Sequence, residues 1–141
     1  MPKGARSGAG GLSVDIKGLD VFLRDLKKFE PEVSKDFRKR LRSIIDKVAK
    51  DAQRRAPKKT GKLSRGIKPS VTNKGAKVVS KAPHAKLFEF GGRHPVYGNK
   101  NNWVFQPAKP YLFPAARENQ ELVNTEALAA LDHAIGQIGF H

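Results

Sequence analysis

A cation-rich segment of the sequence, RAPKKTGKLSRG, comes close to the phosphate-binding pattern G-x-x-x-x-G-K-[ST]. In that pattern, backbone N–H groups cradle the phosphates and a hydroxyl group reaches Mg²⁺. Gly61 and Lys62 match the centre of the pattern. Ala56, however, replaces its first glycine, and Leu63 replaces its hydroxyl residue. Leu63 cannot ligate a metal, and Pro57 removes one of the backbone donors. The segment therefore does not predict a nucleotide site.

Other catalytic or metal-binding patterns are also missing from the sequence. It has four histidines and no cysteine, and neither H-x₃₋₅-H nor H-E-x-x-H spacing occurs. The serine-nucleophile pattern G-x-S-x-G is absent as well. A nuclease acting in packaging would need an acidic metal cluster, which the sequence does not provide. We therefore expect no enzymatic activity, no metal and no cofactor.

Glu89 is the only acid in a long basic stretch, and it lies between Phe88 and Phe90. A carboxylate that is partly buried between phenylalanines needs a partner, because an unpaired buried charge costs several kcal/mol. We therefore predict a structural carboxylate that is held by a cation of its own chain or of a neighbouring subunit. The candidate cations in its own region are Arg65, Lys86 and Arg93.

The charge of the chain is large and unevenly distributed. The net charge is +15 over 141 residues. Residues 1–109 hold 27 lysines and arginines against nine acids, whereas residues 110–141 hold one arginine against four acids. This asymmetry predicts either an anionic partner or head-to-tail packing of copies through opposite patches. The candidate contacts to an anionic partner in the cation-rich segment are Lys58, Lys59, Lys62 and Arg65.

Nucleic acid is one such partner. Tyr97, Trp103 and Tyr111 could stack on bases, but no RRM, KH or zinc-finger signature is present. Large aromatic residues more often pack in a core. A basic nucleic-acid-binding protein therefore stays as an alternative.

The length predicts one domain, with residues 1–11 as a flexible, basic, glycine-rich arm and residues 12–141 as the folded part. No stretch approaches the ~20 apolar residues that span a membrane. The N-terminus has no apolar run of the kind found in a secretory signal, and the lack of cysteine fits synthesis inside a cell.

Apolar spacing predicts the elements of the N-terminal half. Alternation over residues 12–16 predicts a half-buried strand, and residues 19–29 predict a short amphipathic helix. A long helix begins at Pro31 and is ended by Pro57. Its single apolar stripe predicts packing on a sheet. Thr60 and Gly61 then predict a turn in which the glycine adopts positive φ.

The remaining elements are predicted as a small antiparallel sheet and a last helix. We expect Leu63 to open an edge or bent strand that Pro69 interrupts, followed by a turn at residues 72–77 and a returning strand at Val78 and Val79. Residues 87–90 fit a helical turn or a strand. Two further strands flank GNKNN as a hairpin. Near Pro114 the last helix begins. Its predicted apolar stripe is Leu128, Leu131, Ile135 and Ile138. The fold class is α+β, with a small antiparallel sheet packed by the long helix and the C-terminal helix.

Three motifs follow one another in this chain: APKKTGKL after the long helix, PHAKLFEFGG, and KPYLFPA before the last helix. Over residues 12–135 the chain resembles the tail-component, or neck, family of long-tailed double-stranded DNA bacteriophages. That family carries A-P-x-x-T-G-x-L, Y-A-x-x-x-E-F-G and P-F-L-x-P-A. His84 and Tyr111 depart from it, replacing Tyr and Phe. The matching residues are Ala56, Pro57, Thr60, Gly61, Leu63, Ala85, Glu89, Phe90, Gly91, Pro110, Leu112, Pro114 and Ala115.

The resemblance implies a non-enzymatic virion protein that is made in the host cytoplasm. Its copies would form a homo-oligomeric ring, hexameric in this family, at the head–tail junction. The ring would complete the tail and join it to the DNA-filled capsid, with a tail terminator ring as the close alternative. The implied partners are neck, connector and tail-tube proteins, with contact to packaged DNA or the tape-measure protein, and no membrane.

Overall fold

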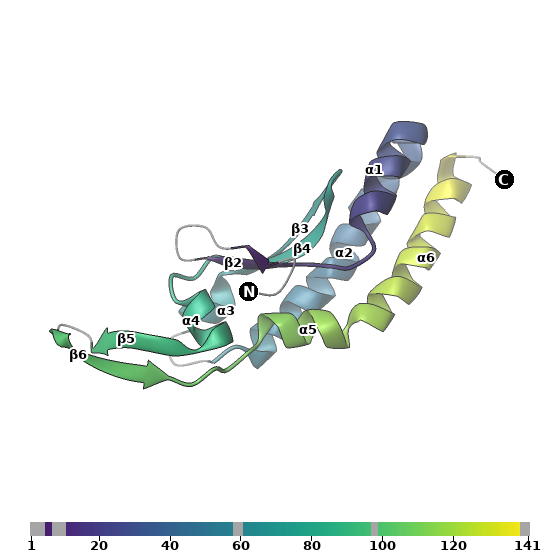
Figure 1. Ribbon diagram of the computed structural model, residues 1–141. Coiled ribbons are helices and arrows are strands. Elements are labelled where there is room, and N and C mark those ends of the chain that lie inside the picture. The colour runs from purple at the N-terminus through teal and green to yellow at the C-terminus, as the bar shows by residue number, and fades with distance from the viewer. Residues whose placement is uncertain (1–4, 7–10, 58–60, 97–98, 139–141) are drawn as a thin grey trace.

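A computed structural model describes residues 5–6, 11–57, 61–96 and 99–138 of the chain (Figure 1). Helices and two antiparallel sheets confirm the predicted α+β class. The elements in chain order are β1 (Ala5–Arg6), β2 (Leu12–Asp15), α1 (Asp20–Phe29), α2 (Pro31–Arg55), α3 (Lys62–Arg65), β3 (Ile67–Thr72), β4 (Gly75–Ser80), α4 (Ala85–Phe90), β5 (Gly92–Val96), β6 (Asn99–Gln106), α5 (Leu112–Glu118) and α6 (Gln120–Ile138).

The main sheet has the strand order β1-β2-β4-β3, and every neighbouring pair is antiparallel. The predicted turn between β3 and β4 is confirmed, since Thr72 pairs with Gly75 across it. Pro69 lies in β3, which is an edge strand as predicted, where a missing N–H costs no ladder bond. At the other edge, β1 pairs with β2, so residues 5–6 of the N-terminal segment that was predicted to be flexible join the sheet. Residues 1–4 and 7–10 of that segment lie outside the described residues.

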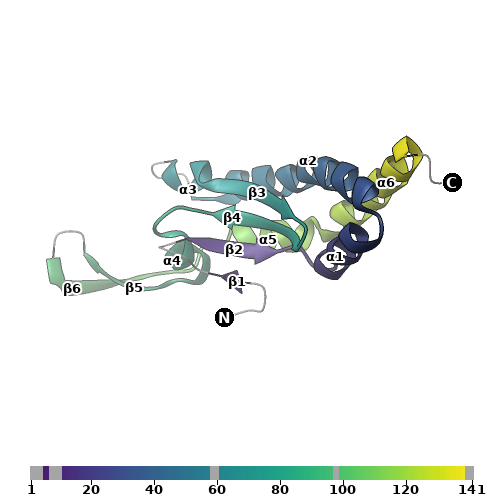
Figure 2. The ribbon, with the colours of Figure 1, turned by 90° about the horizontal axis from the view of Figure 1, so that it is seen from above.

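The long helix α2 is the centre of the fold. It packs on β3 and β4 and also contacts α1, α5 and α6 (Figures 1 and 2). Proline is favoured in the first helical turn, and Pro31 is the first residue of the helix. The helix ends at Arg55 because Pro57 biases the preceding Ala56 toward the extended conformation, with φ −63° and ψ 140°. Its buried residues recur every three or four positions, as the sequence predicts: Val33, Phe37, Leu41, Ile44, Ile45, Val48 and Ala52.

Three details of the predicted elements need correction or completion. Leu63 does not open a strand: it is buried within the short helix α3, and the strand begins at Ile67. Residues 62–65 form a helical turn after Gly61, and Leu63 enters the core from this turn, before β3 starts. Residues 87–90, ambiguous from spacing, belong to the helix α4. The strand β2, an inner strand of the main sheet, buries Leu12, Ser13 and Val14 together.

The predicted last helix is in fact two helices, and its apolar stripe is displaced. The chain breaks at Asn119, so α5 and α6 are separate. Leu128, predicted to be buried, is 69% exposed, and Leu131 and Ile135 are only partly buried. Small residues instead face the body, because they let α6 approach α2 closely. The buried residues of α6 are Val123, Ala127, Ala130 and Ala134.

The predicted hairpin is confirmed as the pair β5–β6, but residues 99–102, predicted to form its loop, belong to the strand β6. It forms a sheet of its own and projects from the body at the end opposite α1 and the C-terminal end of α6 (Figures 1 and 2). We call β5–β6 the arm. The molecule is therefore elongated, with a helical end and an arm end.

Candidate assembly surface

The residues that the sequence motifs single out gather in two places. Pro57, Gly61 and Leu63 lie around the loop that follows α2. The second group lies where α4, the arm and α5 meet, and its members are Glu89, Phe90, Gly91, Pro110 and Pro114. Lys58, Lys59 and Thr60 lie outside the described residues.

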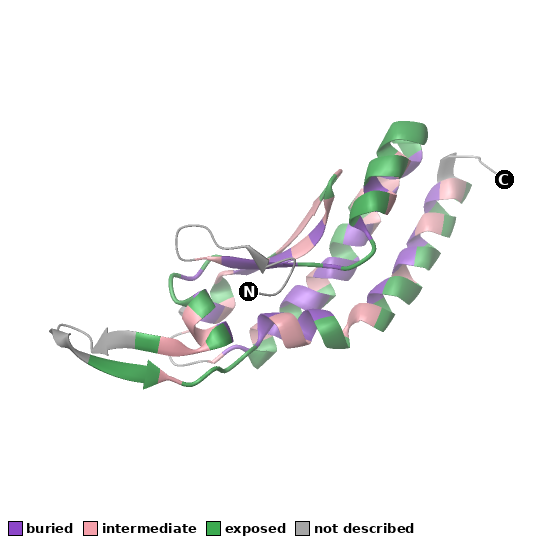
Figure 3. Cartoon of the chain, viewed as in Figure 1, coloured by how far each residue is buried: buried purple, intermediate pink, exposed green. Residues whose placement is uncertain are grey.

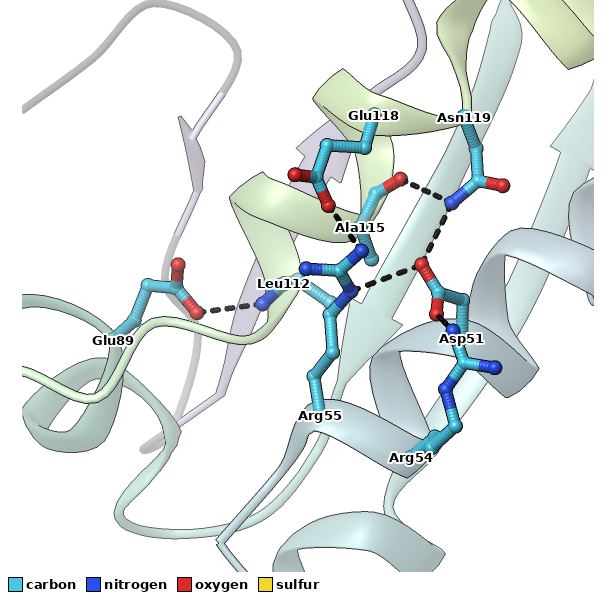
Figure 4. Close-up of polar contacts among 8 residues, drawn as sticks. All are labelled: Asp51, Arg54, Arg55, Glu89, Leu112, Ala115, Glu118 and Asn119. Atoms are coloured by element: carbon cyan, nitrogen blue, oxygen red, sulfur yellow. Dashed lines mark hydrogen bonds and ion pairs between the residues drawn. The ribbon is translucent and has the colours of Figure 1, made fainter.

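Glu89 is the central residue of the second group. It lies in α4, is 3% exposed, and points at the start of α5 (Figure 4). One carboxylate oxygen, Oε1, accepts hydrogen bonds from the backbone N–H groups of Tyr111 at 3.0 Å and Leu112 at 2.8 Å. The other, Oε2, accepts one from Phe113 at 3.2 Å. Among the described residues no cation pairs with Glu89, so the prediction is wrong for a cation of its own chain, while a cation of a neighbouring subunit stays a prediction. The positive end of a helix provides the compensation instead.

Glu89 and Pro114 together satisfy the N-terminal end of α5. The first four N–H groups of a helix have no partner within it. Three of them belong to Tyr111, Leu112 and Phe113 and bond Glu89. The fourth position is Pro114, which has no N–H at all. Two motifs that are separate in the sequence thus form one capping device, and that device fixes where α5 begins.

Tyr111 fixes the same point from the other side. Its side chain is fully buried, and its hydroxyl lies 2.7 Å from the Ser80 hydroxyl at the end of β4. Burial raises the pKa of Tyr111 to about 12, a rise that the Ser80 hydrogen bond opposes and the nearby Glu89 carboxylate reinforces. The core role predicted for large aromatic residues is confirmed for Tyr111. It joins α5 to the main sheet.

Gly91 is the residue at which the chain turns from α4 into the arm. Its φ of 74° and ψ of 176° lie in a region that essentially only glycine adopts. A Cβ atom here would lie 2.8 Å from the backbone nitrogen of Ala108 and 2.9 Å from the carbonyl oxygen of Gln106. The Lys109 N–H also donates to the Phe88 carbonyl oxygen at 2.7 Å. The two strands of the arm are therefore held tightly against α4 where they leave the body.

The arm itself exposes apolar side chains. Trp103 is 52% exposed, Val104 42% and Phe105 69%. Figure 3 shows the exposed class along this part of β6. The expected core packing is thus wrong for Trp103, while Tyr97 lies outside the described residues. Apolar side chains that cluster on a projecting element are typical of a protein–protein contact. At the arm's base, Phe90 is 37% exposed and contacts Phe113, with ring centroids 5.7 Å apart.

The loop after α2 contains the second glycine with a special conformation. Gly61 has a φ of 74°, which confirms the predicted positive value. A Cβ atom there would come within 3.0 Å of the Arg65 guanidinium, so this side chain folds back over the loop. Leu63 anchors the loop in the core. Lys62 is the first residue of α3, and its side chain is not among those described.

A polar network that the sequence did not predict joins α2 to α5 and α6 (Figure 4). Asp51 accepts hydrogen bonds from Arg55 Nε at 3.0 Å and Asn119 Nδ2 at 2.8 Å, and it also pairs with Arg54. Arg55 in turn pairs with Glu118. Asn119 also donates to the Ala115 carbonyl oxygen, which satisfies the end of α5. Nothing in the spacing of these residues could have indicated contacts across 68 positions.

The protonation of this network follows from its geometry. Burial alone would raise the pKa of Asp51, but the hydrogen bonds from Asn119 and Arg55, with the charges of Arg55 and Arg54, outweigh it. The pKa of Asp51 is therefore lowered. The hydrogen bond to Asp51 likewise raises the pKa of Arg55. Both groups stay charged at neutral pH, and the network holds α5 and the α5–α6 junction on the end of α2.

A large cleft of about 1270 Å³ lies between β2, the β3–β4 turn, α1 and α5. Its lining includes Asp15 and Asp20 but also five cations: Lys17, Arg24, Lys74, Lys77 and Arg117. Within the described ranges, no three histidine or acidic side chains gather so that they could hold a metal ion. Of the helices that the structure describes, none has both the length and the apolar composition of a membrane span.

The chain was compared with known proteins. A model of the family described as "Bacteriophage HK97-gp10, putative tail-component" matches residues 20–91, which is about half of the chain. The match runs from the start of α1 to Gly91 at the base of the arm. It includes the loop after α2 and Glu89. No curated protein and no solved structure matches the chain.

Proposed function

Because this chain belongs to the HK97-gp10-like family of bacteriophage tail components, we propose that it is a non-enzymatic structural protein of the virion neck. A tail component works in contact with other proteins of the virion. In this proposal, copies of the chain close into a homo-oligomeric ring at the head–tail junction, hexameric as the resemblance implies. The ring completes the tail and joins it to the DNA-filled capsid, beside neck, connector and tail-tube proteins.

The observation that carries this proposal is the projecting arm. In a monomer, Val104 and Phe105 add little to the stability of the fold, because these side chains of the arm remain in water. The base of the arm is nevertheless tightly fixed by Gly91 and by the capping device of Glu89. A firmly oriented apolar projection suits contact with a neighbouring subunit or with another virion protein.

Two other roles in the virion are compatible with the same architecture. A tail terminator ring would cap the tail tube and use the arm in the same way. Contact with packaged DNA or with the tape-measure protein would use the basic residues of the loop after α2, of which Arg65 is exposed. These roles differ in which neighbour the ring meets.

One observation favours nucleic-acid binding as the alternative from another class. The exposed or partly exposed side of α2 carries Lys35, Lys39 and Arg42, which recur every three or four residues and therefore form one stripe. None of the three has an acidic partner among the described residues. Such a stripe fits a phosphate backbone, and its binding would weaken steeply with salt.

Sedimentation of the purified chain with isolated tails tests the proposal. We expect the protein to form a discrete ring on its own or on the tails, and to co-sediment with tails at salt concentrations that abolish DNA binding. If instead a monomer binds DNA in a salt-sensitive way and does not bind tails, nucleic-acid binding is favoured.

A further inference from the structure

The outer face of α6 carries apolar side chains that the body of the protein leaves uncovered. Leu122 is 42% exposed and Leu128 is 69% exposed, while the opposite side of the helix packs on α2. At 100° per residue, the exposed positions of this helix fall on one continuous stripe. We call six of these exposed residues the α6 stripe: Glu121, Leu122, Thr125, Leu128, Ala129 and Asp132.

A helix that buries one side and shows leucines on the other is typical of a contact between chains. The charge of the α6 stripe is equally one-sided. It contains two acids, and α6 as a whole contains neither lysine nor arginine. Its partner should therefore present apolar groups flanked by cations.

The arm presents that combination. Phe105 is 69% exposed, and the register pairs it with Arg93 on the neighbouring strand. Directly paired residues of an antiparallel ladder lie side by side on the same face. Residues 92–109 contain three lysines and arginines and no acid. One face of the arm thus places an aromatic ring beside an exposed cation.

Within one chain these two surfaces cannot meet. The arm projects from one end of the molecule, and α6 runs toward the other end (Figures 1 and 2). Complementary patches at opposite ends of one chain join copies head to tail, and such contacts give a ring when the rotation closes.

We infer that the arm of one copy docks on the α6 stripe of the next copy, with Phe105 against Leu128 and Arg93 facing Asp132. This inference rests on the proposed ring and names the surfaces that build it. The cleft beside α1 is a less suitable receiver. Its cations outnumber its acids by five to two, and they would repel a basic arm.

Cross-linking tests the contact directly, because the chain contains no cysteine. The double variant Phe105→Cys/Leu128→Cys, treated with a short bis-maleimide, should give a ladder of covalent oligomers on a denaturing gel. Either single variant can give at most dimers. A competing double variant, Phe105→Cys/Lys74→Cys, reports docking in the cleft, since Lys74 lines the cleft and is exposed.

Charge reversal provides an independent test. Arg93→Glu and Asp132→Arg should each weaken self-association about tenfold or more, as measured by sedimentation velocity, and the combination should restore much of it. Asp25→Arg, an exposed acid on α1, is the matched control and should leave association unchanged. Circular dichroism of each variant shows that it is folded.

The outcomes separate this inference from the ring itself. A ladder from Phe105→Cys/Leu128→Cys, together with rescue by the charge-swapped pair, supports the contact. Intact rings that give no ladder, or a ladder only with Lys74→Cys, overturn the contact but leave the ring in place. A chain that remains monomeric alone and with tails contradicts the ring and the contact together.

Discussion

Replacing Glu89 is the sharpest test of how the arm end is held. Its carboxylate is 3% exposed and accepts three backbone N–H groups at the start of α5. Glu89→Ala leaves those donors buried without a partner, and each unsatisfied donor costs about 1–3 kcal/mol. Because such losses are not additive, we expect a total of about 3–5 kcal/mol, which is a large share of the ~5–15 kcal/mol that stabilises a domain.

Glu89→Gln should be milder. Its amide oxygen can take the place of Oε1, which keeps the bonds to Tyr111 and Leu112. Its NH₂ group then faces the Phe113 N–H, so one bond and the favourable charge at the helix end are lost. We expect a loss of about 1–2 kcal/mol.

The assay is urea unfolding of the parent, both variants and Glu32→Ala, an exposed glutamate in the first turn of α2 that serves as the control. The control should lose less than about 1 kcal/mol. Hydrogen exchange of the amides of residues 111–113 should accelerate in Glu89→Ala before exchange elsewhere does. If Glu89→Ala unfolds like the control and those amides keep their protection, Glu89 does not cap α5.

Three further predictions concern the same framework. Gly91→Ala should lower the free energy of unfolding in denaturant by about 2 kcal/mol or more, and by more than Gly61→Ala does. At Gly91, unlike at Gly61, the new Cβ would meet backbone atoms, and equal losses would contradict this. Tyr111 has a raised pKa, so the parent should lose about 2–3 kcal/mol of stability as the pH rises from 10 to 12. Tyr111→Phe should lack that dependence, and an identical alkaline slope in both proteins would count against it. Asp51 has a lowered pKa, so its contribution is present above about pH 4 and is lost as the pH falls through the folded-state value. Asn119→Ala removes one cause of that lowering and should reduce the stability difference between pH 7 and pH 3 by about 1 kcal/mol; an unchanged difference would argue against the network.

Much of the fold was predictable from local patterns. The apolar period predicts the long helix, and proline chemistry predicts the edge position of Pro69. Turn residues between two apolar runs predict the hairpin β5–β6. The special conformation of Gly61 was also predictable, because few other residues fit a tight turn after a helix end. Each of these features depends on a few residues that are close together in the sequence.

Several of the misses depend on residues that lie far away in the chain. Glu89 was expected to pair with a cation, since the sequence cannot show that the start of α5 lies against α4. Leu128 was assigned to the core because alanines carry a weak apolar signal, although Ala127 and Ala130 are the residues that face the body. The exposure of Trp103, which was expected to pack in the core, likewise depends on the arm leaving the body.

We propose that this tail component completes the tail and joins it to the head. The most direct measurement is electron microscopy of particles assembled without this protein, before and after the purified chain is added. We expect filled heads and separate tails, which become joined phage when the chain is supplied. Joined, full-length phage in the absence of the protein would contradict it.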